Sequence, residues 1–438
     1  MFTKKTVKDI DLQGKRVLMR AEYDVPLDDG GRISNDYRIK TSLPTIQYLL
    51  EQGCSIVIMA HLGRPEGVAD PKLSLAPVAT RLGELLGREV QFVHDCIGSE
   101  VSQATEKIQP GQIILLENTR FHPEEEKNDS AFAEKLKNDS HAEIFAQECF
   151  GVAHRAHASV EAIAHLLPSV AGFLLEQEVD TITRVMQSPE RPLMSVIGGA
   201  KVSDKIEILK RLVDISDCVV VVGAMANTFL MATGIAVGKS LVEKDAVDTA
   251  HSILEKVEQK QSQTPFTFLL PQDLIVSANV DGSAPTRIVD LSSQTYADVE
   301  AYPKLPSPES HIVGSEEAIF DIGPTFANRI AGLAMMAKTV IWNGTAGVTE
   351  TKGINSAADP FAHGTETILE SLQGVRNALK PFTLVGGGDT VGYVMSHAEI
   401  DPDSGKPTRL NHVSTGGGAS LELMAGHTLP GVEALLDK

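Results

Sequence analysis

Short apolar runs alternate with longer amphipathic stretches along most of the chain. Apolar, often β-branched runs bounded by polar turns predict buried strands, and stretches with helical spacing, such as Leu43 to Leu50, predict helices. Strands that alternate with helices form a parallel sheet covered by helices, so we expect the α/β class. The predicted strands are 16–23, 55–60, 112–116, 143–146, 193–197, 218–222, 266–270, 339–342, 381–385 and 412–413.

One amphipathic stretch, residues 170–187, is placed to connect two halves of the chain. Its apolar residues recur at helical spacing, and the proline-bounded turn Ser188–Pro192 follows it. A chain of 438 residues with 42% hydrophobic residues is long enough to bury two cores. We therefore predict a first domain at 1–169, a connecting helix at 170–189 and a second domain at 190–428.

The segment 278–311 interrupts the alternation. It contains Asp281-Gly282, Pro285 and the run Lys304-Leu-Pro-Ser-Pro308, which favour turns. We expect an extended, loop-rich excursion before a helical stretch that starts at Thr325. No motif in it indicates a function.

Composition and charge exclude several classes of protein. The formal net charge of −19 leaves no basic surplus to neutralise nucleic-acid phosphates or an anionic membrane. Cys54, Cys96, Cys149 and Cys218 form no C-x-x-C pair, which indicates neither a zinc site nor a disulfide framework. Met1–Lys5 lacks a signal-peptide core, and no apolar run approaches the roughly 18 residues of a membrane span. We expect a cytoplasmic protein with no nucleic-acid or membrane partner.

Charged side chains follow the predicted strands of the first half. Arg38, Arg64, Arg120 and Arg155 lie in or near these strand-end segments. In open α/β sheets, ligands bind beyond the carboxyl ends of the strands, where these arginines would converge. Guanidinium groups match phosphate and carboxylate oxygens, so the group predicts a small anionic substrate. Each arginine by itself is better explained as a surface charge or a helix-end partner.

Four histidines border the same segments. His154 and His157 lie three residues apart, but no carboxylate or cysteine stands at a matching position, and Arg155 between them would repel a metal cation. We expect both to be neutral donors that line the anion site, and we expect the same of His61 and His122. An ordinary structural histidine is the alternative in each case.

Glycine-rich turns replace the arginines in the second half. Gly198-Gly199, Gly223 and Gly344 follow strands, and Gly386-Gly387-Gly388 precedes Asp389-Thr390 at a predicted helix start. Backbone N–H groups at a helix start suit phosphate, and a carboxylate beside them suits Mg²⁺. We therefore expect a nucleotide on the second half. For any single turn, the alternative is that its glycines only permit positive φ.

Lys201 and Lys205 follow the first of these turns. They lie four residues apart, so on a helix they would share a face, from which both could reach phosphate. A solvated lysine pair is the alternative. Neither G-x-x-x-x-G-K-[ST] nor a strand-linked G-x-G-x-x-G is present, which disfavours P-loop enzymes and dinucleotide-binding folds.

Eight strings in this chain together resemble the phosphoglycerate kinase family, in the same order and from about residue 8 to 436. They are Gly14-Lys-Arg-Val-Leu-Met-Arg20, Asn35-Asp-Tyr-Arg38-Ile-Lys, His61-Leu-Gly-Arg-Pro65, Leu116-Glu-Asn-Thr-Arg-Phe-His122, Phe150-Gly-Val-Ala-His-Arg-Ala-His157, Gly198-Gly-Ala-Lys-Val-Ser-Asp-Lys205, Gly386-Gly-Gly-Asp-Thr390 and His412-Val-Ser-Thr-Gly-Gly-Gly-Ala-Ser-Leu-Glu-Leu423.

The resemblance implies two Rossmann-like, doubly wound parallel-sheet domains joined by a hinge helix, the fold of a bilobal kinase. It also implies that the C-terminal tail, about 429–438, packs back on the first domain. The implied reaction is reversible phosphoryl transfer between 1,3-bisphosphoglycerate with ADP and 3-phosphoglycerate with ATP, with Mg²⁺ as cofactor, in a monomer. Such transfer needs in-line positioning and cations rather than a protein nucleophile, and domain closure is expected because water must be excluded.

The resemblance also assigns roles to particular residues. Catalytic roles go to Arg38, Lys201 and Lys205, and the metal ligand is Asp389. The residues assigned to the acid substrate are Glu22, Tyr23, Asp24, Arg38, His61, Leu62, Gly63, Arg64, Arg120, His154, Arg155, Gly416 and Gly417. The residues assigned to the nucleotide are Gly199, Ala200, Lys205, Gly223, Phe320, Asn343, Glu350, Gly386, Gly387, Gly388, Asp389 and Thr390.

Three positions depart from the family pattern. Glu22-Tyr23-Asp24 stands where the family usually has Asp-Phe-Asn, Val222-Gly-Ala-Met225 stands for Gly-Gly-Gly-Met, and Thr345-Ala346 stands for Pro and an apolar residue. The first change predicts weaker affinity for the acid substrate, although Glu22 is long enough to accept a bond from a substrate hydroxyl. The other two predict an altered adenosine pocket.

A non-catalytic, nucleotide-binding paralogue is the alternative function. It predicts loss of the charged transfer residues, whereas Arg38, Lys201, Lys205 and Asp389 are all present. A two-domain dehydrogenase is disfavoured because the dinucleotide fingerprint is missing.

Overall fold

The computed structural model describes residues 2–28, 30–291, 311–354, 358–375 and 380–438. Two compact units make up these residues, and their boundary falls inside a long helix, between Arg184 and Val185. The first unit consists of residues 1–184, 400–406 and 415–438, and the second consists of residues 185–399 and 407–414.

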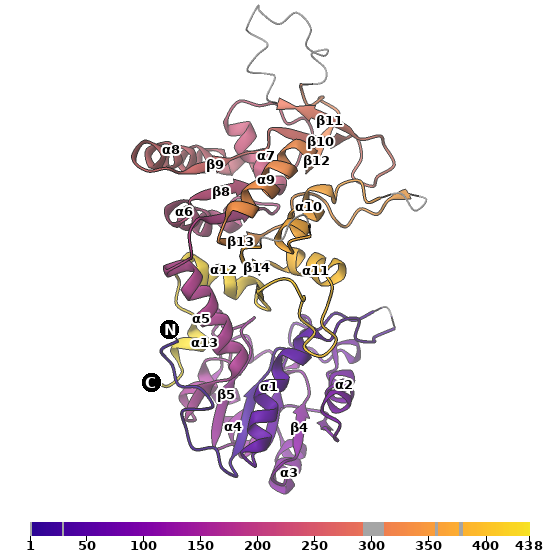
Figure 1. The fold of residues 1–438 in the computed structure, drawn as a ribbon. Helices are drawn as coiled ribbons and strands as arrows, with labels where there is room; N and C mark the ends of the chain where they lie inside the picture. Colours follow the sequence, from indigo (N-terminus) through magenta and orange to yellow (C-terminus); the bar gives the residue numbers. More distant parts are fainter. Residues whose placement is uncertain (1, 29, 292–310, 355–357, 376–379) are drawn as a thin grey trace, which may run out of the picture. The chain divides into compact units, whose positions relative to one another are not determined.

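The first unit contains a six-stranded parallel sheet with the order β3-β4-β2-β1-β5-β6, of which Figure 1 labels two strands, β4 and β5. Its strands are β1 (Arg16–Arg20), β2 (Ser55–Met59), β3 (Gln91–Val93), β4 (Ile113–Leu116), β5 (Ile144–Gln147) and β6 (Ser169–Ala171). Its helices are α1 (Tyr37–Glu51), α2 (Ala76–Leu86), α3 (Ser99–Lys107), α4 (Ser130–Ser140), most of α5 (Phe173–Gln187), α12 (Gly417–Ala425) and α13 (Pro430–Glu433), with the 3₁₀ helices η1 (Pro71–Leu73), η2 (Thr119–Phe121) and η3 (Ala162–His165).

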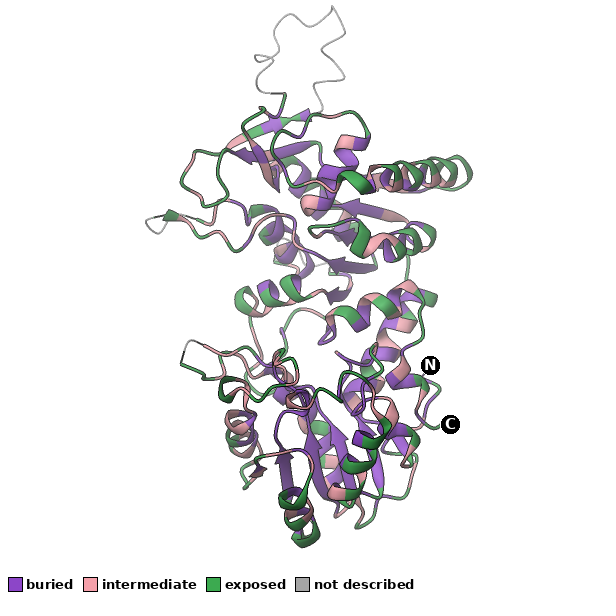
Figure 2. Ribbon diagram, turned by 180° about the vertical axis from the view of Figure 1, so that it is seen from behind, coloured by how far each residue is buried: buried purple, intermediate pink, exposed green. Residues whose placement is uncertain are grey.

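Helices cover both faces of this sheet. Val17 and Met19 on β1 belong to the core cluster that α1 and α2 complete, whereas Leu18 between them belongs to the cluster completed by α3 and α4. Successive side chains of a strand point to opposite faces, so both faces must be apolar. This explains why the strands are continuous apolar runs, and Figure 2 shows them buried beneath helices whose outer sides are exposed.

The C-terminal segment packs on the first unit. Lys5 donates its backbone N–H to Leu436 O at 2.7 Å, and Leu436 donates to Ser169 O at 3.0 Å. Gly431, in α13, donates to Ala153 O at 2.9 Å. The two ends of the chain therefore lie side by side in this unit.

The second unit has a six-stranded parallel sheet, β15-β14-β13-β7-β8-β9, and a three-stranded antiparallel sheet, β11-β10-β12. Its strands are β7 (Leu193–Ile197), β8 (Cys218–Val221), β9 (Thr267–Leu269), β10 (Asp273–Ser277), β11 (Arg287–Asp290), β12 (Ala318–Ile322), β13 (Thr339–Asn343), β14 (Phe382–Gly386) and β15 (His412–Val413). Its helices are α6 (Ile206–Ile215), α7 (Gly223–Ala232), α8 (Val247–Gln263), α9 (Pro324–Met336), α10 (His363–Leu372) and α11 (Gly388–His397), with η4 (Ser203–Lys205) and η5 (Lys244–Ala246). Among the helices of the described residues, none is both long and apolar enough to cross a membrane.

Strand order reverses between β7 and β13 in the large sheet of this unit. The backbones that leave these two strands approach so closely that a Cβ built on Gly344 lies 2.2 Å from Gly198 O. Only glycine fits there, and the crevice outside such a reversal is where open α/β sheets bind ligands.

The predicted α/β class with two parallel sheets is confirmed. The helix expected at 170–187 begins only at Phe173, because residues 169–171 pair with β5 as strand β6. The excursion expected at 278–311 is not all loop, since Arg287–Asp290 pairs with β10; its residues 292–310 lie outside the described residues. The sequence also did not predict β3, β10 and β12, short strands that pair with other strands of the described residues.

A matched pair of glycine substitutions tests the packing at the start of α5. A Cβ on Gly172 would lie 1.7 Å from Oε2 of buried Glu148, whose other oxygen, Oε1, accepts a hydrogen bond from Thr45 Oγ1 at 2.8 Å. We expect Gly172→Ala to lower the free energy of unfolding by about 1–3 kcal/mol, the usual cost of overpacking. Urea unfolding followed by circular dichroism measures it.

Gly332→Ala is the control. Gly332 is exposed within α9 and nothing lies within 4 Å of its Cβ position. Alanine should raise stability there by up to about 1 kcal/mol. Equal urea midpoints for both variants would contradict the packing argument.

Candidate functional site

A buried arginine organises the strand-end cluster of the first unit. Arg20, the last residue of β1, is fully buried and donates from Nε to Ser159 Oγ at 2.8 Å and from Nη1 to Ala21 O at 2.6 Å. Its Nη2 lies 3.0 Å from His61 Nδ1. Since arginine only donates, Nδ1 accepts and the His61 proton sits on Nε2.

His61 and His157 stay neutral in this cluster. Burial lowers the pKa of His61 well below 6.5, and the positive charges of Arg20, Arg120 and Arg38 lower it further. Burial and then Arg120 lower the pKa of His157 to about 3. The predicted role of neutral donors beside arginines is therefore compatible with their surroundings.

Arg38, in the first turn of α1, faces two carboxylates. Its Nη1 lies 3.6 Å from Glu22 Oε1 and 3.6 Å from Asp24 Oδ2, and it donates to the backbone oxygen of Asp24. Nη2 lies 3.4 Å from Thr415 O. The Arg38 side chain remains 32% exposed, so an incoming anion can reach it.

The departure residues Glu22 and Asp24 both make defined contacts. Glu22 is buried, and its Oε2 accepts from Cys149 Sγ at 2.7 Å and from the Gly151 N–H at 2.8 Å. Only Oε1, which faces Arg38, has capacity left for the substrate hydroxyl that we expected it to bind. Asp24 Oδ1 accepts from the Gly63 N–H at 2.8 Å, and Oδ2 lies 3.8 Å from His61 Nε2.

The other predicted arginines differ in exposure. Arg120 is buried; it donates to Gly63 O at 2.9 Å and pairs with Glu126 at 3.2 Å. Arg64 and Arg155 are exposed, and Arg155 Nε donates to His154 Nε2 at 3.3 Å. The structure thus combines a buried arginine with two exposed arginines, which suits an anionic substrate.

Some predicted acid-substrate residues are packed away from solvent. Tyr23 is fully buried with its hydroxyl 3.0 Å from Ser42 Oγ, and burial raises its pKa. Leu62 belongs to the core. Both can offer only backbone atoms to a ligand. Gly416 packs so tightly on Phe150 that its Cβ would lie 2.4 Å from the ring, and Gly417 opens α12.

Contrary to our expectation, His122 does not belong to this cluster. Its Nε2 pairs with Asp95 at 2.7 Å, on a loop that follows β3. Sequence reasoning also left Arg20 out of the site. Its position at the end of a buried strand was the available signal.

A pocket lies at the strand ends of the second unit. Five predicted nucleotide residues line it: Gly199, Ala200, Gly223, Phe320 and Asp389. Three departure residues, Ala224, Thr345 and Ala346, line it too. The remaining lining residues, which the sequence did not single out, are Ala226, Asn227, Pro271, Leu274, Ile319, Asp321, Ile322 and Gly347.

Contrary to our expectation, Lys201 and Lys205 do not share a helix face. Lys205 ends η4, whereas Lys201 precedes it in irregular, exposed backbone. Lys205 donates to Gly198 O at 2.5 Å and to Asn343 Oδ1 at 2.6 Å. Burial lowers its pKa to about 8, with Asp389 opposing the shift, so the ammonium remains mostly charged at neutral pH.

The other predicted nucleotide residues are not among those that line the pocket. Thr390 is buried and accepts from the Gly344 N–H at 2.7 Å, which ties the turn after β13 to α11. Glu350 is exposed. Gly386 ends β14, Gly387 caps α11 with φ of 89°, and Gly388 is its first residue.

Asp389 suits a magnesium ion. It is exposed in the first turn of α11 and lines the pocket. Mg²⁺ keeps several waters and binds through one or two carboxylates plus substrate phosphates, so a single exposed carboxylate beside glycine backbone fits it.

Asp321 is the most perturbed carboxylate of the pocket. It is buried at the end of β12 and accepts from the Gly364 N–H at 2.9 Å and the Ile322 N–H at 2.8 Å. Burial raises its pKa to about 7, against the effect of these two bonds. No motif marked it in the sequence.

Comparison with known proteins gives one consistent answer. The family described as phosphoglycerate kinase matches residues 7–427. Phosphoglycerate kinases of Moorella thermoacetica and Chloroflexus aurantiacus are each 43% identical, with 100% of both chains covered in each comparison. The solved phosphoglycerate kinase of Coxiella burnetii has a TM-score of 0.78 at 33% identity, covering 98% of each chain. That of Pyrococcus horikoshii OT3 has a TM-score of 0.77 at 27% identity, covering 99% of this chain and 98% of the other.

The pKa of Asp321 predicts a pH dependence of stability. Because the folded state raises this pKa from 3.8 to about 7, it binds the proton more tightly than the unfolded state. The resulting stabilisation is complete below about pH 4 and is lost as the pH rises through about 7. Asp321→Asn removes the proton, so the unfolding free energy of the variant should improve relative to the parent between pH 4 and 7 and then level off.

Urea unfolding at a series of pH values measures this difference. Asparagine can accept only one of the two N–H bonds, so a constant loss is also expected, and the slope alone is the test. Asp359→Asn is the control, because a hydrogen bond from Lys352 lowers the pKa of that partly exposed aspartate. A slope for Asp321→Asn as flat as that for Asp359→Asn would contradict the raised pKa.

Proposed function

The chain belongs to the phosphoglycerate kinase family, and on this premise we propose how its own residues serve the reaction. The enzyme transfers a phosphoryl group reversibly between 1,3-bisphosphoglycerate with ADP and 3-phosphoglycerate with ATP, a step of glycolysis. The observation that carries the proposal is Arg38: it is partly exposed, lies 3.6 Å from two carboxylates, and stands beside a buried positive cluster.

On the first unit, arginines and neutral histidines bind the acid substrate. Arg120 and the exposed Arg64 and Arg155 supply guanidinium groups for its phosphate and carboxylate oxygens. His61 donates from Nε2, because Arg20 holds its Nδ1 as an acceptor. Arg20 itself is a positioning residue, buried beneath the site.

Arg38 stabilises the transferring phosphoryl group. Its side-chain contacts with Glu22 and Asp24 are longer than those of a tight ion pair. The oxygens of a doubly charged phosphoryl group therefore displace these carboxylates from the guanidinium. Charge on the equatorial oxygens is what catalysis of phosphoryl transfer must stabilise, and a preorganised cation does so without reorganisation of solvent.

On the second unit, the pocket binds the nucleotide. Its apolar lining, including Phe320, takes the base, and the turn at Gly387 and Gly388 offers backbone N–H groups to the phosphates. Lys205, whose ammonium donates to Gly198 O, contributes a positive charge near the phosphates. Lys201 is exposed and can approach the phosphates from solvent. Asp389 holds Mg²⁺, which when bound neutralises phosphate charge.

Removing the Arg38 guanidinium tests the catalytic assignment. We expect Arg38→Ala to lower kcat at least about a hundredfold, because the lost interaction belongs to the transition state and such a donor contributes roughly 3–4 kcal/mol. Nucleotide binding should survive. A coupled assay of 3-phosphoglycerate-dependent ADP formation gives kcat, and calorimetry gives nucleotide affinity.

Arg32→Ala is the control for this variant. Arg32 is an exposed arginine of the same unit that pairs with Asp28 at 2.9 Å. Its loss should leave kcat unchanged. If Arg38→Ala turned over as fast as Arg32→Ala, Arg38 would have no part in the transfer.

Asp24 provides a test of affinity rather than rate. Asparagine at this position can still accept the Gly63 N–H bond while removing a negative charge that faces Arg38 and His61. We expect Asp24→Asn to lower KM for 3-phosphoglycerate several-fold, about 1 kcal/mol of uniform binding, with kcat little changed. Asp28→Asn, which removes an equal charge beside exposed Arg32, should leave KM unchanged. A higher KM in Asp24→Asn would show that the carboxylate assists binding.

A further inference from the structure

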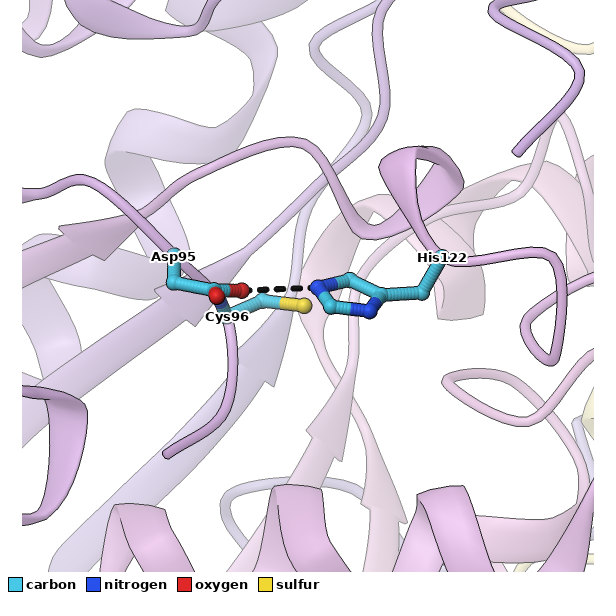
Figure 3. A group of neighbouring side chains, drawn as sticks. All are labelled: Asp95, Cys96 and His122. Atoms are coloured by element: carbon cyan, nitrogen blue, oxygen red, sulfur yellow. Dashed lines mark hydrogen bonds and ion pairs between the residues drawn. The ribbon is translucent and has the colours of Figure 1, made fainter. Parts of the chain in front are cut away.

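Three side chains with metal-binding atoms meet at one edge of the first unit, apart from the arginine cluster (Figure 3). Asp95 and Cys96 lie in the loop after β3, and His122 follows η2. One ligand atom from each lies within 4.8 Å of the others. In Figure 3 the sulfur and the carboxylate both point toward the histidine ring.

Each of the three donors is held in place. His122 Nε2 lies 2.7 Å from Asp95 Oδ1, and the ring packs on Phe132 of α4 with centroids 5.3 Å apart. The Cys96 N–H donates to the same carboxylate oxygen at 2.6 Å. Cys96 is only 1% exposed and packs in the core cluster that α3 and α4 complete, which restricts the movement of its sulfur.

The spacing suits a tetrahedral ion. Zn²⁺ binds sulfur at about 2.3 Å and nitrogen or oxygen at about 2.0–2.2 Å, so its ligand atoms lie roughly 3.2–3.6 Å apart. The three ligand atoms already lie within 4.8 Å of one another, so small side-chain rotations bring them to these separations. The His122 nitrogen and the Asp95 oxygen, 2.7 Å apart, move apart as the ion replaces the proton between them. The side chains of Asp95 and His122 are 45% and 27% exposed, which leaves that side open to water.

The surroundings of the sulfur favour a cation. Three carboxylates, those of Asp95, Glu125 and Glu117, act electrostatically on the Cys96 sulfur. Zinc with one carboxylate, one thiolate and one neutral imidazole carries no net charge, so the buried side of the site is electrically balanced.

We propose that Asp95, Cys96 and His122 bind one Zn²⁺ ion, with water as the fourth ligand. On binding, the Cys96 S–H bond breaks, its proton passes to solvent and the sulfur bonds to zinc. The proton on His122 Nε2 also passes to solvent as that nitrogen bonds to zinc, and a proton taken from solvent on Nδ1 keeps the ring neutral. The thiolate and imidazole select zinc over magnesium, which prefers oxygen ligands. The absence of a C-x-x-C pair in the sequence does not bear on such a site, because it uses a single cysteine.

Metal titration of the full-length, metal-stripped protein tests this proposal. With excess Mg²⁺ present, calorimetry should show one equivalent of Zn²⁺ bound, and Co²⁺ should give a thiolate-to-cobalt charge-transfer band. Cys96→Ser and His122→Gln should each weaken Zn²⁺ binding at least about 100-fold, since even outer contacts of a metal site commonly contribute 10–100-fold. Cys96→Ser should also abolish the band.

His165→Gln is the matched control. His165 pairs with Glu161 at 2.6 Å, as His122 does with Asp95, but His165 is 58% exposed and the metal-binding clusters of the described residues do not include this pair. It should bind zinc like the parent. No zinc binding by the parent, a cobalt spectrum without the thiolate band, or equal affinity in His122→Gln and His165→Gln would each overturn the proposal and leave an ordinary hydrogen-bonded pair. The cobalt spectrum of the parent decides the case if Cys96→Ser fails to fold.

Discussion

Burial of the parallel strands on both faces is the constraint on which the rest of the structure depends. Strand β2, for example, is buried at all five positions, and neighbouring residues of β1 contribute to opposite core clusters. Such strands have no face on which polar side chains can meet solvent, so the chemistry collects where the strands end. In the first unit those ends carry arginine and histidine side chains. In the second they carry glycines whose backbones approach too closely for any Cβ.

The first unit carries a charged side chain, Arg20, in its interior beneath the strand ends. Arg20 is fully buried and bonds to Ser159, whose hydroxyl in turn donates to buried Glu125 at 2.5 Å. The Ser159 hydroxyl thus links the guanidinium to a carboxylate, and Nη2 of Arg20 fixes the tautomer of His61. Burying a charge costs several kcal/mol unless it is paired and hydrogen-bonded. The buried guanidinium in turn provides a positive potential before an anionic substrate binds.

The residues that depart from the family pattern occupy informative places. Glu22 reaches Cys149 and Gly151, and a Cβ on Gly151 would lie 2.4 Å from its Oε2, so the longer acid and the glycine fit together. Glu22 and Asp24 jointly face Arg38, which gives this chain two carboxylates around its transfer arginine. In the second unit, a Cβ on Gly198 would meet Val222 at 2.9 Å, so that departure narrows the turn next to the pocket.

Sequence alone determined the repeating alternation of strands and helices, and with it the α/β class, because apolar periodicity depends only on local geometry. It also determined the chemical contrast between turns that carry arginines and turns that carry glycines, since residue types are known from the sequence itself. The tertiary structure decided what no local pattern encodes. It showed that Arg20 lies beneath the site, that Asp321 lines the pocket, that His122 turns toward Asp95 and Cys96, and that Lys201 lies outside the helix. Each of these depends on contacts between segments far apart in the chain, and burial by such contacts, rather than residue identity, sets the pKa values and pairings of these side chains.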